Sequence, residues 1–126
     1  MIAQPAAVRA VMAGFAAACA AALILLSFWG HPYGIITGSL IMAGALGLVQ
    51  GASFAAIPQL NAGGAARAQA AGAVAQLGNL GTTTGTPILS ALILSQGSAG
   101  LALFVLGFSL LGIVLHLWQA GRRKAA

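Results

Sequence analysis

Residues 10–29 read AVMAGFAAACAAALILLSFW, an uncharged run that decides the fold class of this chain. An α-helix rises about 1.5 Å per residue, so about 20 apolar residues cross the hydrocarbon core of a bilayer. Three more runs without Lys, Arg, Asp or Glu are long enough, at residues 33–57, 68–95 and 99–118. The sequence therefore predicts an all-α, polytopic protein with four transmembrane helices in one membrane domain, residues 1–126, with a tail at residues 119–126.

The composition favours the same interpretation. Of 126 residues, 60% are apolar and 4% charged, with five Lys or Arg and no Asp or Glu, whereas soluble domains carry about a quarter charged residues. A soluble helical bundle would need a polar face on every helix, and residues 10–29 and 99–118 offer none. Without carboxylates the chain lacks acid–base pairs, carboxylate metal ligands and the membrane carboxylate that often carries protons. We expect no enzyme activity, no metal and no cofactor.

The basic residues predict the orientation. With four spans, all five fall on the same side of the membrane, and positive charge is retained in the cytoplasm. We expect both termini and the tail to be cytoplasmic, in a bacterial inner (plasma) membrane. The same five residues form no basic stripe interleaved with aromatics, so no nucleic-acid partner is expected. They are Arg9, Arg67, Arg122, Arg123 and Lys124. A cleaved signal peptide fits less well, because the apolar run continues through residues 23–28.

Residues 68–95 carry a polar stripe. At about 100° per residue its members fall within about 100° of arc, and they are Gln69, Gln76, Asn79, Thr83, Thr86 and Ser90. Amides and hydroxyls in hydrocarbon need partners, so the stripe either hydrogen-bonds neighbouring helices or lines a solute pathway. Glycines lie opposite the stripe, and others in residues 33–57 permit close helix packing. These expected packing residues are Gly78, Gly81 and Gly85, with Gly47 and Gly51.

The distribution of polar and small residues predicts where three of the four spans lie in the bundle. With a polar stripe on one side and glycines on the other, residues 68–95 should be buried on both sides. Residues 10–29 and 99–118 are nearly free of polar groups and are expected to form outer, lipid-facing walls. His31 and His116 fall at opposite ends of spans, where water reaches them, and they are too far apart to share a metal ion.

Residues 67–72, the run QLGNLG at 76–81 and GTP at 85–87 resemble the eleventh helix of major facilitator superfamily transporters. Residues 47–51 and 54–58 resemble the tenth helix, so the four spans would correspond to helices nine to twelve. The resemblance implies transmembrane transport of a small solute, with the tenth helix at the central cavity and the eleventh near the interface between halves. It thereby assigns Thr37 and Gln50 to the pathway, with Gln76, Asn79 and Thr83 beside them; Thr86 joins them through the stripe.

Such transporters need two six-helix halves that move about a central site. We therefore expect this chain to be the C-terminal portion of a transporter, incomplete alone, with the lipid bilayer, a solute and either the missing helices or another chain as partners. Two alternatives stay open. One is a dimeric four-helix exporter, although the small multidrug exporters that it would resemble depend on a membrane carboxylate. The other is a small non-transporting membrane subunit, or a fragment of a longer gene product.

Overall fold

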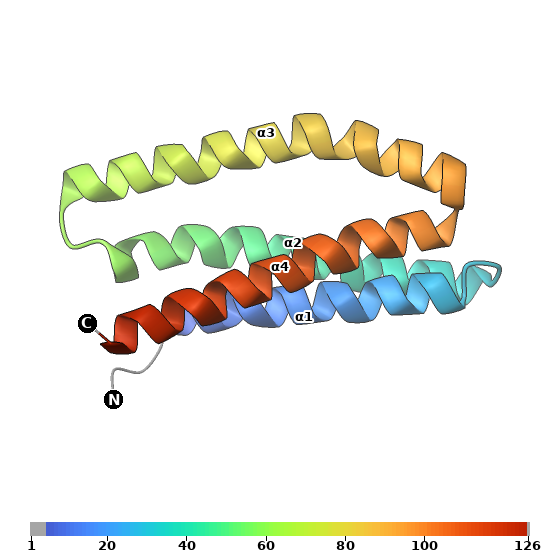
Figure 1. Cartoon of the computed structure of the whole chain (residues 1–126), viewed down its shortest axis with the longest axis horizontal. Helices are drawn as coiled ribbons and strands as arrows, with labels where there is room; N and C mark the ends of the chain where they lie inside the picture. Colours follow the sequence, from blue (N-terminus) through green and yellow to red (C-terminus); the bar gives the residue numbers. More distant parts are fainter. Residues whose placement is uncertain (1–4, 126) are drawn as a thin grey trace.

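The computed structural model describes residues 5–125, which form a bundle of four helices (Figure 1). Successive helices run in opposite directions and are joined by short links at residues 28–31, 61–63 and 97. The prediction of an all-α, four-helix fold is therefore confirmed for the described residues. The helices are α1 at Ala6–Ser27, α2 at Pro32–Leu60, α3 at Gly64–Gln96 and α4 at Ser98–Ala125.

Each helix is longer than the span that the sequence predicts, although α1 ends two residues earlier, at Ser27. The predicted span at residues 33–57 stops before Pro58, and this end is wrong, because α2 continues through Pro58 to Leu60. A proline this late removes one hydrogen bond, that to the Phe54 carbonyl, and the last turn is closed by Asn61. The backbone nitrogen and Nδ2 of Asn61 donate to the Ile57 carbonyl oxygen at 3.0 and 2.9 Å. The expected tail is helical through residue 125 as part of α4.

Three of the four helices are long and apolar enough to span a membrane. These are α1, α2 and the Ser98–Arg122 part of α4. The helix α3 is long enough, but its glycines, threonines and amides leave it short of the required hydropathy. The outside of the bundle is rich in large apolar side chains, with Leu40 69%, Leu94 89% and Leu103 63% exposed. Soluble domains rarely expose so many large apolar side chains, so this surface indicates a membrane-spanning protein.

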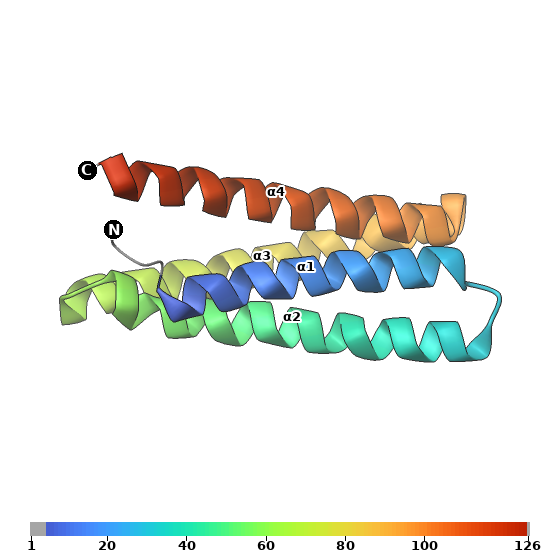
Figure 2. The same cartoon turned by 90° about the horizontal axis from the view of Figure 1, so that it is seen from below.

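The four helices occupy the corners of a square. α1 contacts α2 and α4, and α3 contacts the same two helices, whereas the diagonal pairs do not touch. The links α2–α3 and both described chain ends lie at one end of the bundle, and the links α1–α2 and α3–α4 lie at the other (Figures 1 and 2). Arg9, Arg67 and Arg122 therefore share one end. The side chains of Arg123 and Lys124 lie outside the described part of the chain.

The contact between α1 and α2 is a seam of small residues. Buried positions in α1 recur at alternating spacings of four and three residues, the heptad pattern of closely packed helices. A Cβ atom on Gly14 would lie 2.6 Å from Val49 Cγ2 and 3.1 Å from the Ala45 carbonyl oxygen, so the two backbones nearly touch there. The seam is formed in α1 by Ala7, Val11, Gly14, Ala18, Ala21 and Leu25, and in α2 by Gly38, Ala45, Ala52 and Ala56.

The contact between α1 and α4 centres on an aromatic ring. Phe15 of α1 lies against Gly112, where an added Cβ atom would lie 2.7 Å from the Phe15 ring carbon Cζ. The same ring meets the His116 imidazole edge to face, with 5.9 Å between ring centroids. His116 Nδ1 lies 2.8 Å from the Gly112 carbonyl oxygen. Because a carbonyl oxygen only accepts hydrogen bonds, Nδ1 carries the hydrogen and donates.

The predicted places of two helices are wrong. Residues 10–27 of the first predicted span belong to α1, which has the most buried residues among the helices whose burial is fully described, rather than forming an outer wall. Residues 68–95 belong to α3, which has no buried residue and is therefore not enclosed on both sides. The reason is shape, because α1 presents small residues at heptad spacing while α3 meets its neighbours over less of its length. In α4 the expectation of an exposed wall holds at large apolar residues such as Leu103, Phe108 and Leu110. It does not hold at Gly100, Ala102, Ser109 and Ala120, which are buried.

Candidate functional site: a polar groove between α2 and α3

A groove of about 520 Å³ lies between α2 and α3. Four of its lining residues are polar, two from each helix, and the others are apolar or glycine. Asn79 is close to the middle of α3, and Gln50 lies in the half of α2 nearer to its C-terminus. The groove is lined by Leu46, Val49, Gln50, Ser53 and Phe54 of α2 and by Val74, Ala75, Gly78, Asn79 and Thr82 of α3.

The groove exists because α2 and α3 pack loosely. They make the least extensive contact among the four neighbouring helix pairs. On the α3 side the wall is made of small residues, and no atom lies within 4 Å of the position that a Cβ atom on Gly78 would occupy. On the α2 side Val49 and Leu46 are turned partly toward the groove, while Val49 also reaches Gly14 of α1. The α1–α2 seam therefore fixes one wall of the groove.

Hydrogen bonding divides the four polar side chains into two kinds. Ser53 Oγ donates to the Val49 carbonyl oxygen at 2.6 Å, and Thr82 Oγ1 donates to the Gly78 carbonyl oxygen at 3.0 Å. Their hydrogens are engaged within the helix, so these hydroxyls offer lone pairs and can accept. The Gln50 and Asn79 amides make no hydrogen bond to another described residue, and each offers both donors and an acceptor. The groove can therefore both donate to and accept from a polar molecule.

The residues predicted for a solute pathway do not all meet in the groove. Gln50 and Asn79 line it from opposite sides. Gln76, Thr83 and Thr86 lie on an exposed side of α3 that no described helix contacts, and Thr37 is exposed near the start of α2, at the opposite end from the groove. The pathway role of all six residues stays a prediction.

Two lining residues show what sequence reasoning missed. Thr82 falls outside the predicted stripe, and Ser53 is not among the residues predicted for the pathway. Each follows an amide by three residues, Ser53 after Gln50 and Thr82 after Asn79, which places it on a neighbouring position of the same helix face. The i, i+3 pairing of a hydroxyl with an amide on two successive helices was the available signal.

Most of the glycines expected to pack helices together lie at open positions. No atom of another helix lies within 4 Å of an added Cβ at Gly47, Gly51, Gly78 or Gly81, and Gly85 meets only Phe104 Cζ at 3.6 Å. A packing role for the first four stays a prediction, and it requires a neighbour beyond the described residues. Close packing instead occurs at Gly14, Gly34, Gly38, Gly100 and Gly112. Gly38 belongs to a pair, Gly34 and Gly38, that the spacing of small residues also suggests.

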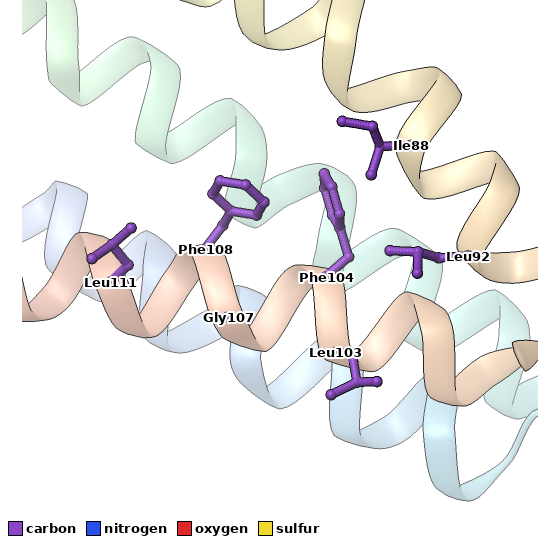
Figure 3. Close-up of a pocket in the computed structure, with 7 residues that line it drawn as sticks. All are labelled: Ile88, Leu92, Leu103, Phe104, Gly107, Phe108 and Leu111. Carbon is purple, nitrogen blue, oxygen red and sulfur yellow. The ribbon is translucent and has the colours of Figure 1, made fainter.

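A second, apolar cavity of about 390 Å³ separates α3 from α4 (Figure 3). Phe104 and Phe108 project into it from α4, with 4.9 Å between their ring centroids. None of its lining side chains has a polar atom, so this cavity suits hydrocarbon and not a polar solute. It is lined by Ile88, Leu92, Leu103, Phe104, Gly107, Phe108 and Leu111.

Comparison with known proteins gives no relative: no family model, no curated protein and no solved structure matches the chain.

Proposed function

We propose that the chain lines a membrane pathway for a small, polar, uncharged solute, as the C-terminal portion of a secondary transporter of the major facilitator type. The observation that carries this proposal is the groove in which Gln50 and Ser53 face Asn79 and Thr82. Amides and hydroxyls from two helices can replace the hydration of a polar solute in a surrounding that is otherwise hydrocarbon. The transporter class rests on the resemblance of α2 and α3 to the tenth and eleventh helices of that superfamily.

The absence of charge narrows the class of solute. No charged side chain lines the groove, and the whole chain contains no carboxylate. A charged solute would lose its hydration there without an opposite charge to compensate, which is costly in a membrane. We therefore propose a neutral solute, and we assign any proton-carrying carboxylate to helices other than these four.

The groove is also incomplete. Gln50 and Asn79 are exposed although they line it, so the described helices do not enclose a solute. We expect the purified chain alone not to concentrate any member of a panel of radiolabelled sugars, polyols and amino acids in liposomes with an inward proton gradient. Saturable accumulation of one of them would contradict the need for further helices.

We propose that both termini are cytoplasmic, in a plasma (inner) membrane. The supporting observation is that the described arginines Arg9, Arg67 and Arg122 share one end of the bundle. The test is labelling of single cysteines in intact cells, in a Cys19→Ala background, with a membrane-impermeant maleimide. Ser98→Cys should react and Ala65→Cys should be protected until the cells are opened. The reverse pattern would overturn the orientation.

The pathway is tested by the access of water to the groove. In the same Cys19→Ala background, Ser53→Cys and Asn79→Cys should react with a cationic methanethiosulfonate at least about tenfold faster than Leu110→Cys, because thiolates form only where water reaches. Leu110 is the matched control, since it lies near the middle of α4 and is 54% exposed on the apolar surface. Equally slow labelling at all three positions would reject the pathway and leave a structural role for the groove.

Filling the groove provides a second test. Gly78→Leu places a side chain in the groove, whereas Gly81→Leu places the same side chain on a part of α3 that does not line it. Both sites are open, so both variants should fold. Labelling of Ser53→Cys should be suppressed by Gly78→Leu and unchanged by Gly81→Leu. Equal effects of the two substitutions would show that the reagent reaches Ser53→Cys by another route.

A further inference from the structure

The polar stripe of α3 has no partner in the bundle. Its six residues, Gln69, Gln76, Asn79, Thr83, Thr86 and Ser90, are all exposed. The half-buried residues of α3 lie on another side of the helix, toward α2 and α4. At about 100° per residue the centres of the two sets are about 140° apart. These half-buried residues include Ala71, Val74, Gly85, Leu89 and Leu92. The stripe therefore points away from every described helix, and only Asn79 reaches the groove.

In a membrane, contact between the polar stripe of α3 and lipid tails is unfavourable. Each unpaired amide in hydrocarbon raises the free energy of the inserted chain, and polar faces of membrane helices turn toward other helices or water. The same residues keep α3 below the hydropathy of a self-sufficient span. The face that needs covering is long, because Gln69 and Ser90 lie about 30 Å apart along the helix at 1.5 Å per residue. A helix of similar length is the cover that fits it.

Three properties of the chain favour a second copy as that cover. An amide both donates and accepts, so Gln76 and Asn79 can pair with the same residues of another copy. The stripe carries no charge, so two copies do not repel each other. The described arginines lie at one end of the bundle, which gives every copy the same orientation in the membrane. Two identically oriented copies meet face to face only around an axis parallel to the helices, and every residue near this axis faces its own counterpart.

We propose that two copies of the chain associate through the polar stripe of α3, with the two α3 helices parallel and each stripe residue beside its own counterpart. Asn79 belongs both to the stripe and to the groove, so the α3 helix of the second copy lies beside the groove without replacing the further helices that the proposed function requires. The inference shares one premise with the proposed function, that the chain spans a membrane, and it does not depend on any solute.

Disulfide cross-linking tests the register. In a Cys19→Ala background, Gln76→Cys and Thr83→Cys should each form disulfide-linked dimers in native membranes. The matched controls are their neighbours, Leu77→Cys and Thr84→Cys, which are exposed at the same depth but lie about 100° around the helix. We expect at least fivefold more dimer at the stripe positions. Equal cross-linking within each pair would overturn the proposed interface.

The unmodified chain gives a second measurement that needs no cysteine. In lipid nanodiscs, native mass spectrometry should detect a species of twice the 12.4 kDa chain mass. Förster transfer between labelled copies in vesicles should fall on dilution with lipid. Replacing Gln76 and Asn79 together by Leu should raise the dissociation constant at least about threefold, because each interhelical hydrogen bond in a membrane is worth about 0.6 kcal/mol or more. Leu77→Ala should leave it unchanged.

The outcomes separate this inference from the proposed function. Dimers cross-linked at Gln76→Cys, together with unreactive Ser53→Cys and Asn79→Cys thiols, would retain the interface and reject the pathway. Reactive groove thiols in a chain that stays monomeric at all lipid dilutions would reject the interface and retain the pathway. A chain that is monomeric alone but cross-links at the stripe to a different protein would also overturn the second copy as the occupant.

Discussion

The seam between α1 and α2 and the groove between α2 and α3 are both made from small residues, yet the first is closed and the second is open. In the seam, Gly14 nearly touches the backbone of α2 at Ala45, and the small residues recur at heptad spacing on both helices. In the groove, Gly78 faces empty space. A glycine permits two helices to approach, but the approach occurs only where the opposite helix repeats the same period.

The largest loss of stability is expected when a large side chain is forced into the seam at its tightest point. Gly14→Leu places a side chain where Val49 Cγ2 and the Ala45 carbonyl oxygen already lie. Because a backbone cannot yield as a side chain can, we expect about 3 kcal/mol or more of lost stability, measured by reversible unfolding in detergent. The matched variant is Gly47→Leu, at an open site, which should change stability by less than about 1 kcal/mol. Similar losses would contradict the described seam.

A smaller difference is expected between the helices in isolation. Fused singly into a reporter for membrane insertion, residues 64–96 should insert less favourably than residues 98–122 by about 2 kcal/mol. The reason is that amides and threonines in α3 occupy positions that Leu, at about −0.6 kcal/mol each near the bilayer centre, occupies in α4. Equal insertion of the two segments would mean that α3 enters a membrane without help from a neighbouring helix. The groove wall formed by α3 would then differ from the seam only in how closely the helices pack.

The contact between α1 and α4 should respond to a single methyl group. In Gly112→Ala the added Cβ meets the Phe15 ring at 2.7 Å, and the ring must move away from His116, at a cost of about 1 kcal/mol. Gly107→Ala, on the same helix with open space around it, should be neutral or slightly stabilising. In a Phe15→Leu background the cost of Gly112→Ala should disappear, and a cost that persists would place the strain elsewhere.

The smallest effect is expected at the edge of the seam. Gln59 Oε1 accepts a hydrogen bond of 3.2 Å from the backbone nitrogen of Ala7, one of the free donors in the first turn of α1. Gln59→Leu should therefore lower the free energy of unfolding by about 0.5 kcal/mol. Gln119→Leu on α4 removes an exposed amide that makes no hydrogen bond to a described residue and should have little effect. Equal free energies of unfolding for the two variants would show that this hydrogen bond does not stabilise the end of the seam.

The sequence predicts the elements better than their arrangement. Uncharged runs between breaks locate all four helices, because length and apolarity are local properties. Burial is different. The heptad spacing of small residues from Ala7 to Leu25 indicates a closely packed, buried face on α1. This spacing is hard to recognise in a chain so rich in alanine and glycine. The stripe on α3 was recognisable as polar, but periodicity gives only relative angles, so it could not say which side faces α2. Asn79, a predicted pathway residue, lines the groove, as does Thr82, which the stripe does not include, and the pathway role of Asn79 stays a prediction.

The proline inside α3 has a consequence for how the stripe can be observed. Pro87 has no N–H, so the carbonyl of Thr83 lacks the donor that the fourth following residue normally supplies. This carbonyl sits on the stripe and is free to report its surroundings. With a ¹³C=¹⁸O label at Thr83, its infrared amide I band should lie at high frequency against hydrocarbon and shift to lower frequency against water or a donating neighbour. One backbone oxygen thus serves as a spectroscopic gauge of what covers this face, without any substitution in the protein.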